Sequence, residues 1–379
     1  MMKRIISYIW YKIIAFPFRF LPIKNNRILF ENFFGKGYGD NPKYIADELL
    51  KQDSKKIELI WLVKGSYKDD IPKEIRQVKR GTLKELYYLS TSKIWIDNSR
   101  KPLGTTKRKK QFYIQTWHGG YGMKKVEKEV INTLDKYYVK SAIADSKMID
   151  LFISSSKAFS KQVRDFFWYD GKILESGLPR TDILVNNKNI KNSKDNILLY
   201  APTFRDNGNT WVYNLDYEEL RKNLKNKFGG NWKIYIRFHP NISYLQDSIK
   251  YNKNIINATN YGDINNLILK SDILLTDFSS CIFDAMIAGK KTFMYAPDLE
   301  EYISQRGIDI DFNIVPFSLS KNKEELYKNI ENFDLKRYEE KIEDFFKKIG
   351  SFEKGTATKE ICKAINQEIK EGEKNEKRN

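Results

Sequence analysis

The chain has 379 residues, of which 41% are hydrophobic and 14% aromatic. This length is too great for one typical core and suits two domains of roughly 150–200 residues each. The apolar content excludes a long disordered or repetitive protein. Lysine and arginine number 67 against 49 aspartates and glutamates, and this formal charge of +18 predicts an anionic partner.

The positive charge indicates an anionic ligand but does not say which one. Nucleic acid, an anionic membrane and a phosphorylated small substrate would all fit it.

The two cysteines, Cys281 and Cys362, lie far apart and in no CxxC or Cys/His spacing, so we expect neither a disulfide framework nor a zinc site. A reducing cytoplasm fits this composition best.

Residues 1–24 form a basic, aromatic and amphipathic stretch without an acid. Lys12 and Pro17 interrupt its apolar run, which is shorter than the ~20 residues that span a bilayer, and no small-residue cleavage site follows. We predict a segment that lies in the membrane interface, where each cation near anionic lipid contributes about 1 kcal/mol. The alternative is a first helix packed on the domain.

Strand-like runs alternate with amphipathic stretches from Arg27 onward, which is typical of an α/β fold. The alternation pauses in the polar residues 186–196 and then restarts. We therefore predict two doubly wound, Rossmann-like domains that face each other across a cleft, with ligands at the carboxyl ends of the strands. The predicted divisions are residues 1–24, 25–190, 191–350 and 351–379, the last being a helix and a charged tail.

The only two histidines follow strand-like runs, His118 in QFYIQTWHGG and His239 in WKIYIRFHP. A hydrogen-bonded loop histidine is the ordinary interpretation of either one. The neighbours of both favour a ligand site instead. Gly119 and the glycines after it let the backbone approach a ligand closely, and Arg237 shares a face of its strand with His239.

A third candidate is LLTDFSSCIFDAM, in which a buried strand runs into a helix. The hydroxyls and free amides of the first helical turn suit a pyrophosphate, although an ordinary helix cap made by Asp277 or Ser279 is the commoner arrangement. In LLYAPTFRDN, Thr203 and Arg205 follow another strand, and Arg205 is predicted to bind a phosphate through two hydrogen bonds.

Three other sequence features give only weak support for a functional site. The glycines of FFGKGYGDNP lack the spacing of a nucleotide-binding P-loop. Asp309 and Asp311 form a DxD, which is at most a weak metal ligand set. The basic residues 99–110 resemble a patch for nucleic acid or phospholipid, and a solvated loop explains them equally well.

Several motifs, taken in order, resemble the CDP-glycerol glycerophosphotransferase family of teichoic acid synthesis. They are FENFFGKGYGDNP, TWHGG, ESGLPRTD, YAPTFRD, RFHP, TDFSSCIFD and APDLEEY. The resemblance covers roughly residues 26–345 and is specific as a set, although each motif alone is weak. Many members have Thr-Pro after the WHG, where this chain has Gly120 and Tyr121.

The resemblance implies a GT-B-like fold, with residues 25–190 on the acceptor side and residues 191–350 binding a CDP-activated donor. It implies attack by an acceptor hydroxyl on the β-phosphorus of CDP-glycerol, with release of CMP. His118 would be the general base, and His239 would stabilise charge on the pyrophosphate. The further residues assigned to the substrate site are Gly119, Arg180, Thr203, Arg205, Arg237, Thr276, Asp277, Ser279, Ser280 and Glu300.

The expected partners are CDP-glycerol or CDP-ribitol, a lipid-linked saccharide acceptor and an anionic membrane surface on the cytoplasmic face. We expect no cofactor, and activity without a metal, with magnesium on the diphosphate as an alternative. Three alternatives to glycerol phosphate transfer stay open: a CDP-ribitol donor, a sugar-nucleotide glycosyltransferase of the same fold and, least supported, nucleic-acid binding. Whether one unit or many are added is also open.

Overall fold

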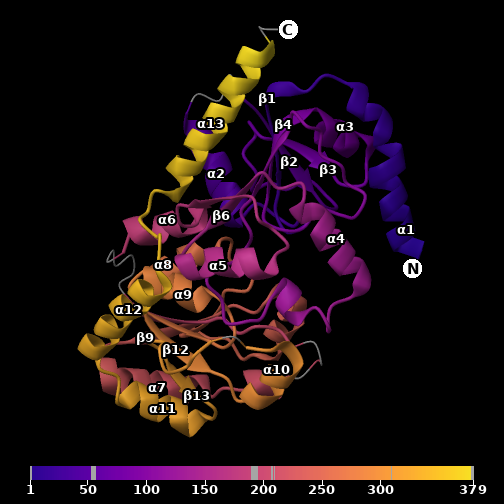
Figure 1. The fold of residues 1–379 in the computed structure, drawn as a ribbon. Helices are drawn as coiled ribbons and strands as arrows, with labels where there is room; N and C mark the ends of the chain where they lie inside the picture. The colour runs from indigo at the N-terminus through magenta and orange to yellow at the C-terminus, as the bar shows by residue number, and fades with distance from the viewer. Residues whose placement is uncertain are drawn as a thin grey trace. The chain divides into compact units, whose positions relative to one another are not determined.

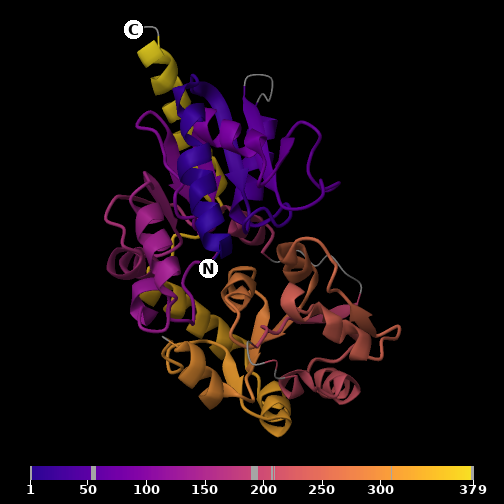
Figure 2. The same ribbon diagram turned by 90° about the vertical axis from the view of Figure 1, so that its right-hand side faces the viewer.

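The computed structural model of the protein describes residues 2–52, 57–188, 195–205, 208, 210–308 and 310–376. The chain divides into two compact units (Figures 1 and 2). The first comprises Met1–Gly120, Val126–Asp182 and Phe352–Asn379, and the second comprises Tyr121–Lys125 and Ile183–Ser351.

This division departs from the sequence-based one at both ends and at the boundary. The N-terminal segment belongs to the first unit, the long crossing falls after Asp182 rather than after residue 190, and the chain returns to the first unit at Phe352. A short excursion, Tyr121–Lys125, also belongs to the second unit. Composition marks linkers and breaks, but it carries no signal for a segment that packs on a distant part of the chain.

The first unit is built on a seven-stranded sheet in the order β3-β2-β1-β4-β5-β6-β7, with every neighbouring pair parallel. The apolar runs predicted as strands are these strands, and most of their residues are buried, as expected for a sheet covered on both faces. The strands are β1 (Lys24–Glu31), β2 (Glu58–Val63), β3 (Arg76–Lys79), β4 (Ser92–Asp97), β5 (Phe112–Gln115), β6 (Leu151–Ser154) and β7 (Lys172–Glu175).

Helices of the first unit begin at side chains that accept hydrogen bonds from free amides of the first turn. Thr82, Asp135 and Ser156 do this for α3, α4 and α5. The helices are α1 (Met2–Ile9), α2 (Asp40–Lys51), α3 (Leu83–Thr91), α4 (Lys136–Ser146), α5 (Lys157–Phe166), α6 (Pro179–Asn186) and α13 (Ala357–Glu376), with a π-helical turn at Trp10–Ile14 and 3₁₀ turns at Phe16–Phe20 and Glu127–Val130.

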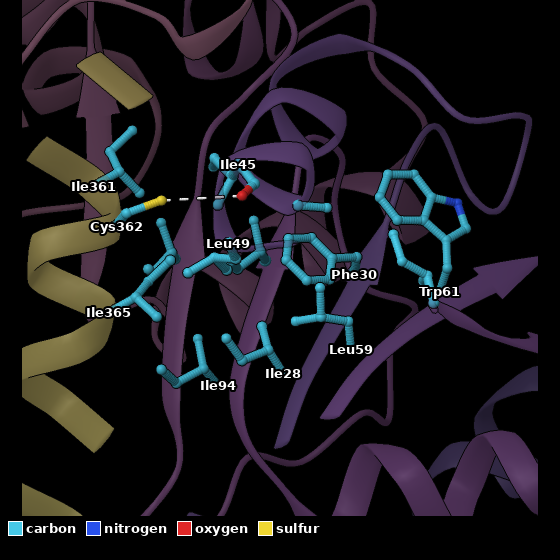
Figure 3. Close-up of a cluster of buried hydrophobic side chains, with 14 of the residues drawn as sticks. Ile28, Phe30, Ile45, Leu49, Leu59, Trp61, Ile94, Ile361, Cys362 and Ile365 are labelled. Carbon is cyan, nitrogen blue, oxygen red and sulfur yellow. Dashed lines mark hydrogen bonds between the residues drawn. The ribbon is translucent and has the colours of Figure 1, made fainter. Parts of the chain in front are cut away.

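The C-terminal helix α13 completes the core of the first unit (Figure 3). Ile361, Cys362 and Ile365 are fully buried beside α2 and β1, and the Cys362 thiol lies 3.9 Å from the carbonyl oxygen of Ile45. The helix continues to Glu376 and so takes in most of the part that the sequence predicted as a charged tail. The buried apolar face explains why this charged sequence stays helical.

The second unit holds a six-stranded parallel sheet in the order β10-β9-β8-β11-β12-β13. Its strands are β8 (Asn196–Tyr200), β9 (Trp232–Ile236), β10 (Ile255–Asn257), β11 (Ile273–Thr276), β12 (Lys291–Tyr295) and β13 (Ser318–Ser320). Its helices are α7 (Tyr217–Phe228), α8 (Ile264–Lys270), α9 (Cys281–Ile287), α10 (Leu299–Arg306), α11 (Lys323–Glu331) and α12 (Leu335–Ile349), with 3₁₀ turns at Trp211–Tyr213 and Pro240–Ser248.

Both sheets therefore have the doubly wound order, in which the direction of winding reverses between two central strands. The reversal falls between β1 and β4 in the first unit and between β8 and β11 in the second. The predicted α/β class with two Rossmann-like halves is confirmed, whereas the cleft between them stays a prediction.

The N-terminal segment is anchored on the first unit while most of its apolar side chains remain exposed. Tyr11 is buried and donates a hydrogen bond to Glu85 at 2.8 Å, and Arg108 holds the carbonyl oxygen of Leu21 at 2.6 Å. The exposed residues are Met2, Ile5, Ile6, Tyr8, Ile9, Ile13, Ile14, Phe16, Phe20 and Leu21. Among the described residues, no helix has the length and apolar character needed to cross a bilayer.

Candidate active site

Except for Arg180, which follows β7, the residues that the sequence motifs predicted lie at the reversal points of the two sheets or one strand away from them. In doubly wound sheets, ligands bind beyond the carboxyl ends of the strands at these points, where neighbouring loops diverge to opposite faces. In the first unit, the loop after β1 meets Asn98 after β4, since the Phe33 amide donates to Asn98 Oδ1 at 2.8 Å. In the second unit, Thr203 after β8 meets Asp277 after β11 at 2.8 Å.

His118 lies one strand beyond the reversal point of the first sheet, after β5. The preceding Trp117 has a left-handed backbone, with φ at +52°, which is unusual for a bulky residue. Its indole stacks on the imidazole with the ring centroids 4.5 Å apart, and the Phe33 ring lies 5.3 Å away. Sparsely populated backbone conformations cluster at functional sites, where the surroundings hold them in place.

The hydrogen bond of His118 decides which ring nitrogen carries the proton. Its Nδ1 lies 2.7 Å from the carbonyl oxygen of Asn98, and a carbonyl only accepts. Nδ1 is therefore the protonated nitrogen of the neutral ring, and Nε2 keeps the free lone pair. Burial lowers the pKa of His118 below 6.5, against the attraction of Asp40, so the ring is neutral near pH 7.

Side chains at the start of α2 and α6 hold the backbone around His118. Arg180 donates to the His118 carbonyl oxygen at 3.1 Å and lies 3.5 Å from Asp40, so it positions the histidine loop. Asn41 donates to the Trp117 carbonyl oxygen at 3.0 Å. The space around Gly119 is open, which agrees with the predicted approach of a ligand there.

In the second unit, Asp277 fastens the loop after β8 to the loop after β11. Its Oδ1 accepts hydrogen bonds from the Thr203 amide at 2.9 Å and from the Thr203 hydroxyl at 2.8 Å. The Thr276 hydroxyl is fully buried and donates to the carbonyl oxygen of Ala201 at 2.7 Å. These three residues therefore build the loops of the site, and their direct contact with a substrate stays a prediction.

The guanidinium of Arg205 forms ion pairs with two carboxylates of the protein. Its Nε and one terminal nitrogen contact the two carboxylate oxygens of Asp298 at 2.6 and 3.0 Å, which is the paired geometry that the sequence predicted for a phosphate. The other terminal nitrogen lies 2.9 Å from Asp277, and Arg205 is 7% exposed. Arg205 thus links three loops at the strand ends, and its charge is balanced by two carboxylates.

His239 has the opposite hydrogen-bonding pattern from His118. It precedes the 3₁₀ turn Pro240–Ser248, and its Nδ1 accepts a hydrogen bond from the Asn241 amide at 3.1 Å. Because an amide only donates, Nδ1 is unprotonated and the proton of the neutral ring lies on Nε2. The Phe204 ring lies 4.7 Å away, from the loop after β8.

The hydrogen-bond partners of Arg237 are backbone carbonyl oxygens. It donates to the carbonyl oxygens of Tyr261 and Gly262, which are polar but uncharged. Burial lowers its pKa, and Asp263 and Cys281 act in the opposite direction. Arg237 rather than Arg205 is the better source of positive charge for a phosphate on this side, because a carbonyl does not neutralise a guanidinium.

Ser279 and Ser280 lie at the start of α9, half-buried. Ser280 makes no capping hydrogen bond, and Ser279 accepts only a long one, 3.4 Å from the Cys281 amide. The ordinary helix cap therefore accounts poorly for both hydroxyls, and their predicted contact with the diphosphate stays a prediction. Glu300 is instead exposed on α10 and pairs with Lys321 at 2.5 Å.

No metal site takes shape in the part of the chain that the structure describes. It contains no group of three acidic, histidine or cysteine side chains close enough to share an ion. Asp309 of the DxD lies outside the described residues, and Asp311 accepts a hydrogen bond from the Asn313 amide at 2.8 Å. Cys281 and Cys362 are both buried free thiols.

Comparison with known proteins identifies the family of this chain. The model of a family described as CDP-glycerol:poly(glycerophosphate) glycerophosphotransferase matches residues 13–367. The chain belongs to this family. The resemblance seen in the motifs is thereby confirmed, and the match extends beyond them into the N-terminal segment and α13.

Among the relatives, a teichoic acid poly(glycerol phosphate) polymerase of Staphylococcus epidermidis is 32% identical over 374 residues, which cover 92% of this chain and 52% of that protein. A protein of the same name from Bacillus spizizenii is 31% identical over 371 residues, which cover 91% of this chain and 93% of that one. The chain thus spans about half of the first relative and nearly all of the second.

Solved structures give the same assignment. The wall teichoic acid polymerase TagF is 31% identical, with a TM-score of 0.80 over 92% of this chain and 90% of that chain. A putative UDP-N-acetylglucosamine 2-epimerase from Listeria monocytogenes has a TM-score of 0.59 at 15% identity, which shows the fold alone. These likenesses, together with the two doubly wound sheets, confirm the predicted GT-B-like architecture.

Sequence reasoning missed four residues that shape the site: Asp40, Asn41, Asn98 and Asp298. Asn98 and Asp298 each come shortly after a strand, and this position at the carboxyl edge of a sheet was an available signal. The roles of Asp40 and Asn41 depend on contacts with Arg180 and Trp117, which are distant in sequence. No local pattern could have shown those contacts.

Proposed function

We propose that the protein transfers glycerol phosphate from CDP-glycerol to a lipid-linked cell-surface polymer acceptor and releases CMP. The observation that carries the proposal is similarity along 91–92% of the chain to proteins named for glycerol phosphate, at 28–32% identity. Proteins named for ribitol phosphate are 23–26% identical. A glycerol donor is therefore favoured over a ribitol donor.

The two histidines supply complementary halves of the chemistry. His118 Nε2, which has the free lone pair, takes the proton from the acceptor hydroxyl as its oxygen attacks the β-phosphorus. The bond from the β-phosphorus to the bridging oxygen breaks, and CMP leaves with that electron pair. His239 donates its Nε2 proton as a hydrogen bond to a phosphate oxygen, where negative charge develops.

Positive charge near the diphosphate comes from Arg237, and the hydroxyls of Ser279 and Ser280 add donors at the first turn of α9. Charge stabilisation and positioning are the main tasks in phosphoryl transfer, because the protein forms no covalent bond. Solved structures of the relative TagF include a soak with CDPG and variants in which a histidine is replaced. This chain has two histidines in all.

A donor panel tests the proposal. Purified full-length protein would be given CDP-glycerol, CDP-ribitol or UDP-sugars with a lipid-linked acceptor in mixed micelles, with and without EDTA, and CMP and UDP release would be measured. We expect CMP from CDP-glycerol, also in EDTA. CMP only from CDP-ribitol would support the ribitol alternative, and UDP release would support a glycosyltransferase.

We further propose that the protein acts on the cytoplasmic face of the membrane as a peripheral protein. Support comes from the N-terminal segment, in which Ile6, Ile13 and Phe16 are 59%, 58% and 51% exposed beside basic residues. Exposed apolar side chains next to cations favour the boundary between headgroups and acyl chains. Trp10, in the same segment, packs against the core cluster of Tyr11 and is not part of this exposed surface.

A further inference from the structure

Arg80 lies directly after β3 and contacts three separate segments of the first unit. Its Nε lies 3.0 Å from a carboxylate oxygen of Glu31, the last residue of β1. One terminal nitrogen donates to the Phe34 carbonyl oxygen at 3.0 Å, and the other donates to the Tyr11 hydroxyl at 3.1 Å. The guanidinium therefore joins the end of β1, the turn that follows it and the N-terminal segment.

Charge balance is an ordinary explanation for part of this arrangement. Arg80 lies 3.0 Å from Glu31 and 3.5 Å from Glu85, and both of these acids are buried. A buried carboxylate needs a partner of opposite charge. The hydrogen bond to the Phe34 carbonyl oxygen is different, because that oxygen carries no charge to be balanced. It gives Arg80 a second role, in the turn after β1.

The turn at residues 32–37 has an unusual backbone. Phe33 and Phe34 are both left-handed, with φ at +41° and +59°, which is uncommon for bulky residues. Gly35 follows at +84°, and a Cβ placed there would lie 3.0 Å from Cδ of Arg80. Backbone of this kind persists only where its surroundings hold it in place. Arg80, which lies against Gly35 and binds Phe34, supplies part of that hold.

The same turn holds Asn98, whose carbonyl oxygen lies 2.7 Å from His118 Nδ1. The Asn98 side chain donates to Asn32 Oδ1 at 2.7 Å and accepts from the Phe33 amide at 2.8 Å. The Phe33 ring also lies 5.3 Å from the His118 ring. The position of the turn therefore sets both the hydrogen-bond acceptor of the imidazole and one of its neighbouring rings.

We propose that Arg80 is a positioning residue for His118, and that it acts by fixing the turn that holds Asn98. Tyr11 supports Arg80 from the N-terminal segment. This inference rests on the proposed function, in which His118 is the base. Arg80 acts through the turn rather than on a substrate, and a misplacement of about 1 Å caused by a distant residue lowers rates by as much as about 100-fold.

The ring nitrogens of the histidines give a readout that needs no donor. Because the chain has two histidines, labelling with ¹⁵N-histidine gives one set of ring signals for each, and His239→Gln assigns them. The spectra would be recorded near pH 8, above the ordinary histidine pKa of about 6.5. We expect His118 of the wild type to carry its proton on Nδ1. A proton on Nε2 instead would overturn the role given to Asn98 and to the turn.

Arg80→Lys is the main variant, because it keeps the charge but loses the planar fork that reaches three segments at once. The His118 signals should shift toward the average of the two tautomers, since the Asn98 carbonyl is no longer held in place. We expect kcat for CMP release to fall about 10- to 100-fold. The KM for CDP-glycerol should not change, because the groups proposed to bind the donor lie in the second unit.

Arg76→Lys is the matched control, at an arginine of β3 whose side chain is 65% exposed and 4.0 Å from Glu58. It should change neither the ring signals nor kcat. Circular dichroism and urea unfolding would verify folding. A folded Arg80→Lys that is less stable, but has the tautomer and kcat of the wild type, would show that Arg80 only balances buried acids. A lower kcat with an unchanged tautomer would also overturn the proposal.

Tyr11→Phe is the milder second variant, which decides the question if Arg80→Lys does not fold. It keeps the buried ring and removes one hydrogen-bond partner of Arg80, so both readouts should move in the same direction but less far. If neither moved, the support from the N-terminal segment would be refuted. If the ring signals behaved as expected but the wild type released no CMP, the proposed function would be wrong, while the effect of Arg80 on the histidine would stand.

Discussion

His118 and His239 lie in comparable places, each one strand away from the reversal point of its sheet, yet their surroundings assign them opposite chemistry. Nδ1 of His118 faces a carbonyl oxygen, whereas Nδ1 of His239 faces an amide. The first contact leaves Nε2 free to take a proton, and the second leaves Nε2 with a proton to donate. One backbone group beside each ring is therefore enough to separate a base from a donor.

The arginines of the two regions differ as well. Arg205 is balanced by two buried carboxylates at 2.6 and 2.9 Å, whereas Arg180 lies 3.5 Å from Asp40. In the second unit, ion pairs hold the loops of the site directly, while around His118 ring packing and backbone hydrogen bonds hold the imidazole and the ion pairs of Arg100 with Glu127 and Asp145 lie behind Trp117. Differences of this kind predict different responses to substitution.

The largest expected effect is on turnover. His118→Gln and His239→Gln should each lower kcat by about 100- to 10,000-fold, the range for proton transfer and charge stabilisation. The pH profile of kcat/KM separates them. Because burial lowers the pKa of His118, the wild type should stay active below pH 6.5 and lose activity as that imidazole gains a proton.

This acid limb should disappear from the residual activity of His118→Gln and remain in His239→Gln. CMP release between pH 4.5 and 8, with circular dichroism to verify folding, would provide the measurement. If the limb disappeared only in His239→Gln, the two roles would have to be exchanged.

The next prediction compares the two arginine ion pairs by their contribution to the free energy of unfolding. Asp298→Asn should lower the free energy of unfolding by about 3–5 kcal/mol, because it leaves Arg205 buried with one of its two carboxylates. Asp40→Asn should cost less than that, because its contact with Arg180 is longer, at 3.5 Å, and an asparagine can still accept the hydrogen bond from the Asn41 amide. Urea unfolding monitored by tryptophan fluorescence would measure both.

Asp40→Asn has a second readout that Asp298→Asn lacks. The charge of Asp40 raises the pKa of His118, so its removal should move the acid limb to lower pH. The sign follows because the neutral imidazole is then favoured further. An unmoved limb would mean that Asp40 has no influence on the base.

A smaller effect concerns the start of α9. Ser280→Ala should weaken CMP binding by about 10- to 100-fold, the loss of one hydrogen bond to a charged group. Its stability should not change, because the hydroxyl makes no capping bond. Calorimetry with CMP and thermal unfolding provide the two measurements. Lower stability with unchanged CMP affinity would instead support the helix cap, and Ser279→Ala offers the matched comparison.

The smallest expected effect on chemistry comes from the N-terminal segment. Replacing Ile6, Ile13 and Phe16 by serine should lower binding to anionic vesicles by about 10-fold or more, since exposed apolar area is lost. The rate with a soluble acceptor analogue should not change. Substitution is preferable to deletion of this segment, because deletion would remove Tyr11 from the core.

Co-sedimentation at low and high salt would follow the binding, with Leu335→Ser as the control, an apolar residue of the second unit that is 48% exposed. Equal binding by the triple variant and the wild type would show that another surface meets the membrane.

Much of the fold could be predicted from the sequence. The strand-like runs from Arg27 onward, which form β1, β2, β4 and β5, were visible because buried parallel strands are short, continuous apolar runs. The alternation with amphipathic helices then gave the doubly wound class. The return of α13 to the first unit was not predictable, because its apolar stripe shows that it packs but not on what.

For the site, the sequence by itself determined the candidates. The two histidines, the glycines beside His118 and the polar residues at strand ends are local features, and the carboxyl edge of a parallel sheet brings such residues together. Only the tertiary structure decided which partner each of these side chains binds. Arg205 was predicted to meet a phosphate and meets Asp298, while His118 and His239 received opposite tautomers from Asn98 and Asn241. The reason is physical: a side chain's type sets what it is able to donate or accept, whereas its partner depends on which distant backbone folding brings within about 3 Å.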